Sequence, residues 1–194
     1  MSTHHPAPSP VYLGPAARDG GPGNKPIRRI VIHSTVSPCQ RGGARNIARY
    51  FATTDRFASA HYVVDPGEVV QVVYDSTIAY HAPPNSGSLG VEMCEVPSQD
   101  LARWAEPNRS EMLDRTAQLV AELCLAYGVP VAHRGPIGLR LGRRGITTHA
   151  NVGKAWGQTD HWDPGAWPRR DFMRAVRRYR RALRKARRRA RKGN

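Results

Sequence analysis

A chain of 194 residues is long enough for one domain with a proper core and too short for two large ones. Its composition, 40% apolar and 23% charged, is ordinary for a globular protein, and the lack of any run of 18 apolar residues excludes a transmembrane helix. The net charge of +15 is unevenly placed: residues 169–192 hold 14 Arg or Lys and one acid, Asp171, whereas the remainder holds 16 basic and 14 acidic residues. A near-neutral domain therefore carries a strongly basic C-terminal segment.

The N-terminal residues 1–25 are rich in Pro, Gly and Ala and lack the basic start and apolar stretch of a signal peptide. We expect a flexible lead-in, and a chain made in the cytoplasm without a signal peptide. The three cysteines form no Cys-x-x-Cys pair, which argues against a zinc ribbon or thioredoxin motif. Cys94 and Cys124 lie in apolar stretches and are expected in the core.

The first half of the chain reads mainly as strands. Residues 28–33 form an apolar run that ends on a histidine, and residues 43–53 have apolar side chains at helical spacing. Two β-branched runs, 60–64 and 69–74, flank a Pro-Gly turn and predict a hairpin. A further strand is expected over residues 89–94.

The second half is more helical. A long apolar stripe predicts a helix from about Ser110, as N-cap, to Tyr127, with Gly128 ending it. Residues 130–145 are predicted to form a loop. The chain then reaches Ile146-Thr147-Thr148-His149, and a long loop is predicted from there to Pro168. Apolar residues in steps of three and four predict a helix over the last segment, residues 169–194. We expect its first half to pack against the domain through an apolar stripe and its arginine-rich second half to protrude.

Strands interleaved with helices, together with a hairpin, predict an α/β fold with a mixed central β-sheet flanked by helices. We expect three parts: a flexible segment over 1–25, an α/β domain over 26–168, and an amphipathic Arg-rich helix over 169–194.

Candidate metal ligands follow from this placement. His33 ends a buried strand, His149 follows Gly145-Ile146-Thr147-Thr148, and the loop after it contains Asp160 and Asp163. Two imidazoles, one carboxylate and an open position make up the usual catalytic zinc site. Eight histidines and fifteen acids offer many such triples, so spacing alone does not select one.

Several motifs together resemble the type 2 N-acetylmuramoyl-L-alanine amidases. They are Val31-Ile32-His33-Ser34-Thr35, Ser59-Ala60-His61-Tyr62, Ile78-Ala79-Tyr80-His81-Ala82, Ser88-Leu89-Gly90-Val91-Glu92-Met93, Gly145-Ile146-Thr147-Thr148-His149 and Asp163-Pro164-Gly165. They occur in the family's order over about residues 27–168. The resemblance implies a peptidoglycan hydrolase that cleaves the amide bond between N-acetylmuramic acid and L-alanine.

The resemblance also assigns the metal site. It implies that His33, His149 and Asp163 bind Zn²⁺, with Asp160 as a substitute for Asp163 because the gap after His149 is long. His161 stands where many relatives carry an oxyanion-stabilising Lys or Thr, and an imidazole can donate the same hydrogen bond. Ala60 replaces a catalytic tyrosine of some relatives.

Glu92 stands out without the family. It shares a strand face with Gly90 and Cys94, and a carboxylate in so apolar a strand is costly to bury unless it is paired. It is either a structural ion-pair partner of an arginine or the general base, and the resemblance favours the base. His81 and Asn85 are expected to line the substrate groove, and His61 to be structural.

The basic helix has three candidate anions: nucleic acid, lipid head groups, and anionic polymers of the cell envelope. The alternative is a solvated segment that only aids solubility. We expect envelope attachment by a monomeric, phage-type endolysin that acts on the wall after release. Two other functions remain open: a non-catalytic peptidoglycan-binding module, and a nucleic-acid-binding protein acting through the basic helix.

Overall fold

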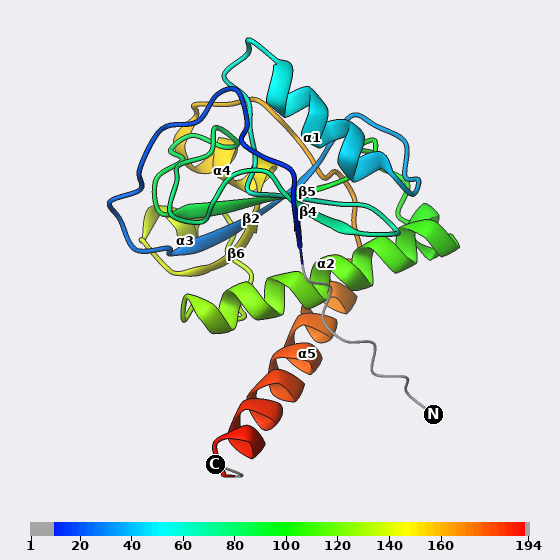
Figure 1. Ribbon diagram of the computed structural model, residues 1–194, viewed down its shortest axis with the longest axis vertical. Helices are drawn as coiled ribbons and strands as arrows, with labels where there is room; N and C mark the ends of the chain where they lie inside the picture. The colour runs from blue at the N-terminus through cyan, green and yellow to red at the C-terminus, as the bar shows by residue number, and fades with distance from the viewer. Residues whose placement is uncertain (1–9, 193–194) are drawn as a thin grey trace.

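The computed structural model describes residues 10–192 and contains a six-stranded sheet between layers of helices (Figure 1). The strand order is β1-β4-β3-β5-β2-β6. The strands are β1 Val11–Tyr12, β2 Arg29–Ser34, β3 Tyr62–Val64, β4 Val69–Gln71, β5 Ser88–Met93 and β6 Gly145–Thr148. The pair β3 and β4 is antiparallel and the other neighbours are parallel, which confirms the predicted hairpin and the mixed α/β sheet.

Helices cover both faces of this sheet. Helices α1 (Gly43–Thr53) and α4 (His149–Trp156) lie on one face, and α2 (Pro107–Ala126) lies on the other (Figure 1). The short η1 (Ala102–Ala105) precedes α2, and α3 (Pro136–Arg140) packs beside α4. Because β2 and β5 are covered on both sides, they can be apolar along almost their whole length.

The structure differs from the predicted elements at one helix start and in two short helices. Helix α2 begins at Pro107 rather than at Ser110, because proline suits the first helical position, where its missing N–H is not needed. Helices α3 and α4 occupy stretches that we predicted as loops. Both are short and contain a glycine, which hides helical periodicity. Gly153 in α4 is required by packing, since a Cβ there would lie 2.6 Å from the carbonyl oxygen of Thr159.

The N-terminal segment is a correction to the expected domain boundary at residue 26. Residues 1–9 lie outside the described part, but 10–25 run along the sheet and pair with it through β1. The amide of Leu13 donates to Gln71, that of Gly20 donates to Ile78, and Ala16 is buried. Because residues 10–25 form these backbone hydrogen bonds with residues of the domain, they belong to the domain.

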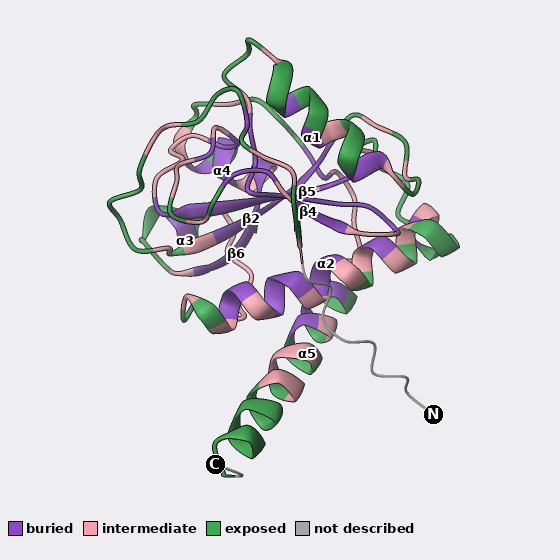
Figure 2. Cartoon of the chain, in the orientation of Figure 1, coloured by how far each residue is buried: buried purple, intermediate pink, exposed green. Residues whose placement is uncertain are grey.

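Helix α5 (Arg169–Ala190) lies outside α2, at the bottom of the molecule (Figure 1). Phe172, Met173 and Val176 are buried against the core, and Tyr179 and Leu183 pack against it in part. From Arg184 onward every described residue is exposed (Figure 2). The first half therefore docks and the second half protrudes, as predicted.

The remaining composition-based expectations concern cysteine and the membrane. Cys94 and Cys124 are buried free thiols of the core, as expected. Within residues 10–192, no helix has the length and apolar character needed to cross a membrane.

Candidate metal and catalytic site

The registration of two parallel strands brings His33 and Glu92 together. Strands β2 and β5 pair so that His33 lies opposite Glu92, and residues in register on neighbouring strands point to the same face. Nδ1 of His33 lies 3.8 Å from Oε1 of Glu92. The pairing of these two apolar strands thus also places the His33 and Glu92 side chains side by side.

His149 reaches the same edge from the other side of β2. Strand β6 runs parallel to β2, with Ile32 opposite Thr148, so both strands end at one edge. Thr148 then caps α4 by accepting a hydrogen bond from the amide of Asn151, which makes His149 the first helical residue. The Nδ1 atoms of His33 and His149 are 3.1 Å apart.

Asp163 completes the cluster from the loop that follows α4. Its Oδ1 lies 3.0 Å from Nδ1 of His149, and its Oδ2 lies 3.3 Å from Nδ1 of His33. The loop is held in place because the amide of Ala150 donates to the Asp163 carbonyl and that of Ser34 donates to Oδ2. Asp160, the substitute considered from sequence, is exposed and lies outside this cluster.

These three side chains fit a metal ion. All are buried, and one ligand atom from each lies within 4.8 Å of the others. The outer ring nitrogens have partners of their own, since Nε2 of His33 faces His81 at 3.0 Å and Nε2 of His149 faces Thr159 Oγ1 at 3.2 Å. With a proton on each Nε2, both Nδ1 lone pairs point at a carboxylate, an arrangement that a cation stabilises.

The charge states agree with this arrangement. Burial lowers the pKa of His33, which favours the neutral imidazole that binds metal. Burial by itself raises the pKa of Asp163, but hydrogen bonds with His149 and His33 outweigh it and hold that pKa below its ordinary value. The pKa directions thus favour a neutral imidazole at His33 and an ionised carboxylate at Asp163.

Glu92 has the environment of a proton-transfer group. Burial, and next the charge of Asp163, raises the pKa of Glu92 well above its ordinary value. Its Oε2 is buried without a hydrogen-bond partner, and among the described residues no arginine forms an ion pair with it. The alternative of a structural ion pair therefore finds no partner in residues 10–192, while a carboxyl with a raised pKa at a cleft suits general base chemistry.

His161 lies at the mouth of the cluster. Its ring stacks on that of His149, with centroids 4.7 Å apart and planes 8° apart, and its Nδ1 is 3.8 Å from Asp163 Oδ1. Two-thirds of its side chain is exposed, so it can donate a hydrogen bond to a bound molecule.

His81 is placed behind His33 rather than in open solvent. Its Nδ1 faces His33, its Nε2 lies 3.1 Å from Ser88 Oγ, and Ser88 Oγ donates to the carbonyl of Asn85. Gly90 makes room for this ring, since a Cβ there would lie 2.6 Å from His81 Cγ. Asn85 Oδ1 accepts from the amides of His81 and Ala82 and holds the loop.

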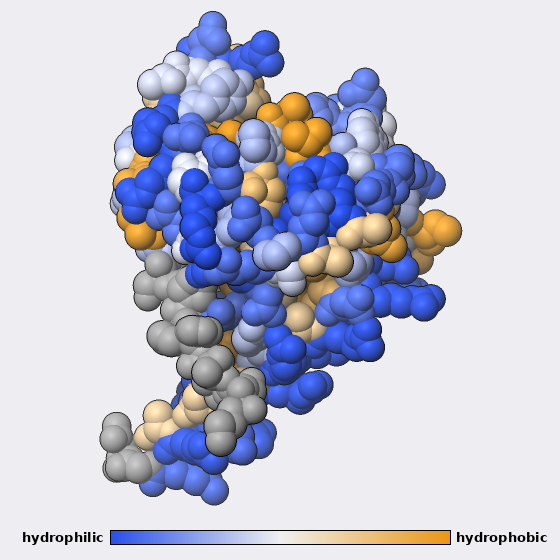
Figure 3. All heavy atoms as spheres, turned by 90° about the vertical axis from the view of Figure 1, so that its right-hand side faces the viewer, coloured by the Kyte–Doolittle hydropathy of each residue, from blue (hydrophilic) through white to orange (hydrophobic). Residues whose placement is uncertain are grey.

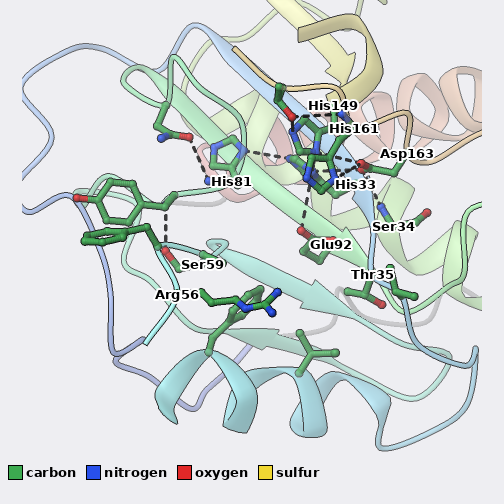
Figure 4. A pocket seen from close by; sticks show the side chains of 18 of the residues that line it. His33, Ser34, Thr35, Arg56, Ser59, His81, Glu92, His149, His161 and Asp163 are labelled. Atoms are coloured by element: carbon green, nitrogen blue, oxygen red, sulfur yellow. Dashed lines mark hydrogen bonds and ion pairs between the residues drawn. The ribbon is translucent and has the colours of Figure 1, made fainter. Parts of the chain in front are cut away.

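A cavity of about 760 Å³ opens beside the cluster, toward α1 (Figure 4). Its walls include His33, His81, Asn85, Glu92, His149, His161 and Asp163 together with Tyr50, Arg56, Phe57, Tyr80 and Thr159. The last five were not singled out from sequence. Tyr50 and Phe57 resemble ordinary helix and loop residues, and nothing in the pattern marks Thr159 as a partner of His149.

One further prediction concerns a residue near the site. His61 is fully buried, accepts from the amide of Gly90 at Nδ1 and lies 3.0 Å from the Thr77 carbonyl through Nε2. These bonds agree with the expected structural role. Trp162 is half exposed beside Asp163, whereas Trp167 packs against Phe172.

Comparison with known proteins gives the family. The model of the family described as N-acetylmuramoyl-L-alanine amidase matches residues 23–166, which is most of the chain. The chain belongs to this family. The match ends before α5, so the basic helix lies outside the part that the family shares.

Individual relatives agree with this membership. A probable N-acetylmuramoyl-L-alanine amidase of Bacillus licheniformis is 35% identical over 120 residues, which cover 53% of this chain and 31% of that protein. The fold is similar to that of the Staphylococcus aureus hydrolase AmiA, solved with its ligand, with a TM-score of 0.71 and 17% identity over 91% of this chain and 85% of that one. It is also similar to that of a mutant endolysin from Bacillus subtilis, with a TM-score of 0.57 and 18% identity over 87% and 99%. The chain spans about a third of the length of the curated relatives it matches.

Proposed function

We propose that this protein hydrolyses the amide bond between N-acetylmuramic acid and the L-alanine of the peptidoglycan stem peptide. The observation that carries the proposal is the meeting of His33, His149 and Asp163 beside Glu92, in a chain that belongs to the amidase family. The named activity of the Bacillus relatives supplies the substrate class.

Zn²⁺ is the cofactor that the proposed site suits, held by His33, His149 and Asp163. When bound in such a site, zinc lowers the pKa of a coordinated water toward about 7 and polarises a carbonyl.

Glu92 is the proposed proton carrier. Its Oε1 accepts the proton of the attacking water as the new C–O bond forms, and returns it to the amine of L-alanine as the C–N bond breaks. His161 is placed to donate a hydrogen bond to the negative oxygen that develops on the carbonyl. Groups of these two kinds each accelerate a reaction on the order of 100-fold or more.

The cavity beside the cluster is the proposed substrate groove. Asn85 contributes to it and remains a proposed substrate contact. His81 was expected to be a second contact, but both its ring nitrogens face groups within the protein. We therefore propose that His81 orients His33 instead of binding substrate through its nitrogens.

The proposed place of action is the cell wall, as for an endolysin, with the chain working as a monomer. A non-catalytic peptidoglycan-binding module is the competing function, but such a module has no need of a buried three-ligand cluster with an unpartnered carboxyl beside it.

The test is digestion of purified peptidoglycan with and without a chelator. We expect new N-terminal alanine groups, loss of their release in chelator and recovery when zinc is restored. New reducing sugar ends would instead indicate a glycosidase, and binding without release of either would indicate a binding module. Glu92→Gln should lower the rate about 100- to 10,000-fold while zinc content is unchanged.

A further inference from the structure

The exposed end of α5 is a surface that the proposed reaction does not use. Seven of the nine residues 184–192 are Arg or Lys, and the other two are Ala186 and Ala190. Among the described residues, none of these seven cations forms an ion pair, whereas Arg178, six residues nearer the domain, pairs with Asp114 of α2 at 2.9 Å. The lower end of the molecule in Figure 3 is accordingly dominated by hydrophilic side chains.

The cations cover one broad side of the helix. An α-helix has 3.6 residues per turn, so Ala186 and Ala190, four residues apart, share one side and the seven cations occupy the rest. All of the seven except Arg187 border, together with Arg181, a common groove along the helix. A concentration of unpaired guanidinium and ammonium groups costs self-repulsion, which a polyanion relieves.

The apolar side of this segment does not suit insertion into lipid. Helices that lie in a membrane interface bury large apolar or aromatic side chains, and here the only apolar side chains are those of two alanines. Leu183, the last large apolar residue, is already packed against the domain.

The segment also lacks what base recognition requires. Residues 184–192 contain no aromatic side chain on which a nucleic acid base could stack and no Asn or Gln to read a base edge. What remains is recognition of phosphate, to which Arg makes paired hydrogen bonds.

We infer that residues 184–192 bind a linear phosphodiester polymer of the cell wall and hold the amidase domain beside its substrate. The choice of a wall polymer over other phosphate chains rests on the proposed function, which places the substrate in the wall. Attachment is electrostatic, so it weakens steeply as salt is raised.

The test measures sedimentation of the full-length protein with purified wall sacculi that retain their phosphate polymers or have been stripped of them chemically. Arg184, Arg188 and Arg191 are replaced together by Gln. The matched control replaces Lys25, Arg49 and Arg143, which are exposed on the domain, and removes the same charge. We expect at least about tenfold weaker binding for the helix variant at low salt, near wild-type binding for the control, and loss of wild-type binding on stripped sacculi.

Three outcomes would overturn the inference: equal loss in both variants, undiminished binding to stripped sacculi, or tighter binding to duplex DNA or anionic phospholipid vesicles than to intact sacculi. Release of alanine amino groups from stripped sacculi is measured in parallel. If the helix variant still releases them, a failed binding result counts against the helix alone and leaves the proposed amidase activity standing.

Discussion

Nδ1 of His81 lies 3.0 Å from Nε2 of His33, on the side of the ring opposite Asp163. Partners of this kind fix the tautomer and orientation of a metal-binding imidazole and are typically worth 10- to 100-fold in metal affinity. We therefore predict that His81→Phe, which keeps a ring but removes the acceptor, lowers zinc affinity by about 10- to 100-fold. Competition with a chromophoric chelator measures it. His81→Gln, which can keep an acceptor, should lose less, and unchanged affinity in the Phe variant would contradict the orienting role.

Gly90 gives an independent way to move the same ring. Its added Cβ would lie 2.6 Å from His81 Cγ, closer than real Cβ atoms come to a neighbour, so Gly90→Ala must displace the imidazole. We predict weakened zinc affinity, in the same direction as His81→Phe. Gly135→Ala is the control, because Gly135 has no atom within 4 Å of the added carbon and a φ of −81° that alanine adopts. Equal zinc affinity in the two alanine variants would show that His81 has room to move without consequence.

The buried His61 predicts a pH dependence of stability. Burial lowers the pKa of His61 to about 4, from an ordinary 6.5. The unfolded chain therefore takes up a proton at a higher pH than the folded one, so stability is full above about pH 6.5 and is lost as the pH falls toward 4. Between pH 7.5 and 5 the contribution of this one group is about 2 kcal/mol.

We expect His61→Gln to lower stability at neutral pH, because the bonds to Gly90 and Thr77 change, but to flatten the decline on acidification. Urea unfolding of both proteins without metal at pH 7.5, 6 and 5 measures the difference. Two parallel pH profiles would rule out His61 as a source of the acid sensitivity.

Glu95 anchors the start of α2 to the end of β5. It is almost fully buried, and its carboxylate accepts from Arg103 at 2.6 Å and from Arg109. Removing one partner of a buried pair leaves charge uncompensated, so we predict that Glu95→Ala destabilises the fold by about 3 kcal/mol. Glu111→Ala, which breaks the more exposed pairs with Arg41 and Arg115, should cost less than about 1 kcal/mol in the same denaturation experiment. Similar losses for the two would mean that burial adds nothing to the Glu95 pairs.

Much of the architecture could be predicted because the local spacing of apolar residues indicates it. The apolar run ending on His33, the hairpin over β3 and β4, and the stripes of α2 and α5 each report which face is buried, and periodicity depends on that alone. The same holds for Glu92, whose place between Gly90 and Cys94 in an apolar strand marks it without a partner being known.

Short elements with little hydrophobic periodicity could not be predicted from the sequence. Helix α4 has eight residues with Gly153 inside, and the segment over 10–25 contributes a strand of two residues and single backbone hydrogen bonds. Neither segment shows a periodic spacing of apolar residues, because each is held by contacts with residues distant in sequence.

By itself, the sequence determined the chemistry available: one histidine near the end of a strand and one just after another, an acidic loop, a buried glutamate and a cationic C-terminal helix. Only the tertiary structure decided which of these groups meet. His33 and His149 are 116 residues apart in the chain and 3.1 Å apart through their Nδ1 atoms, and Asp163 rather than Asp160 completes the cluster. The reason is physical: strand register and loop packing set distances between side chains, whereas residue order along the chain sets only which face each side chain occupies.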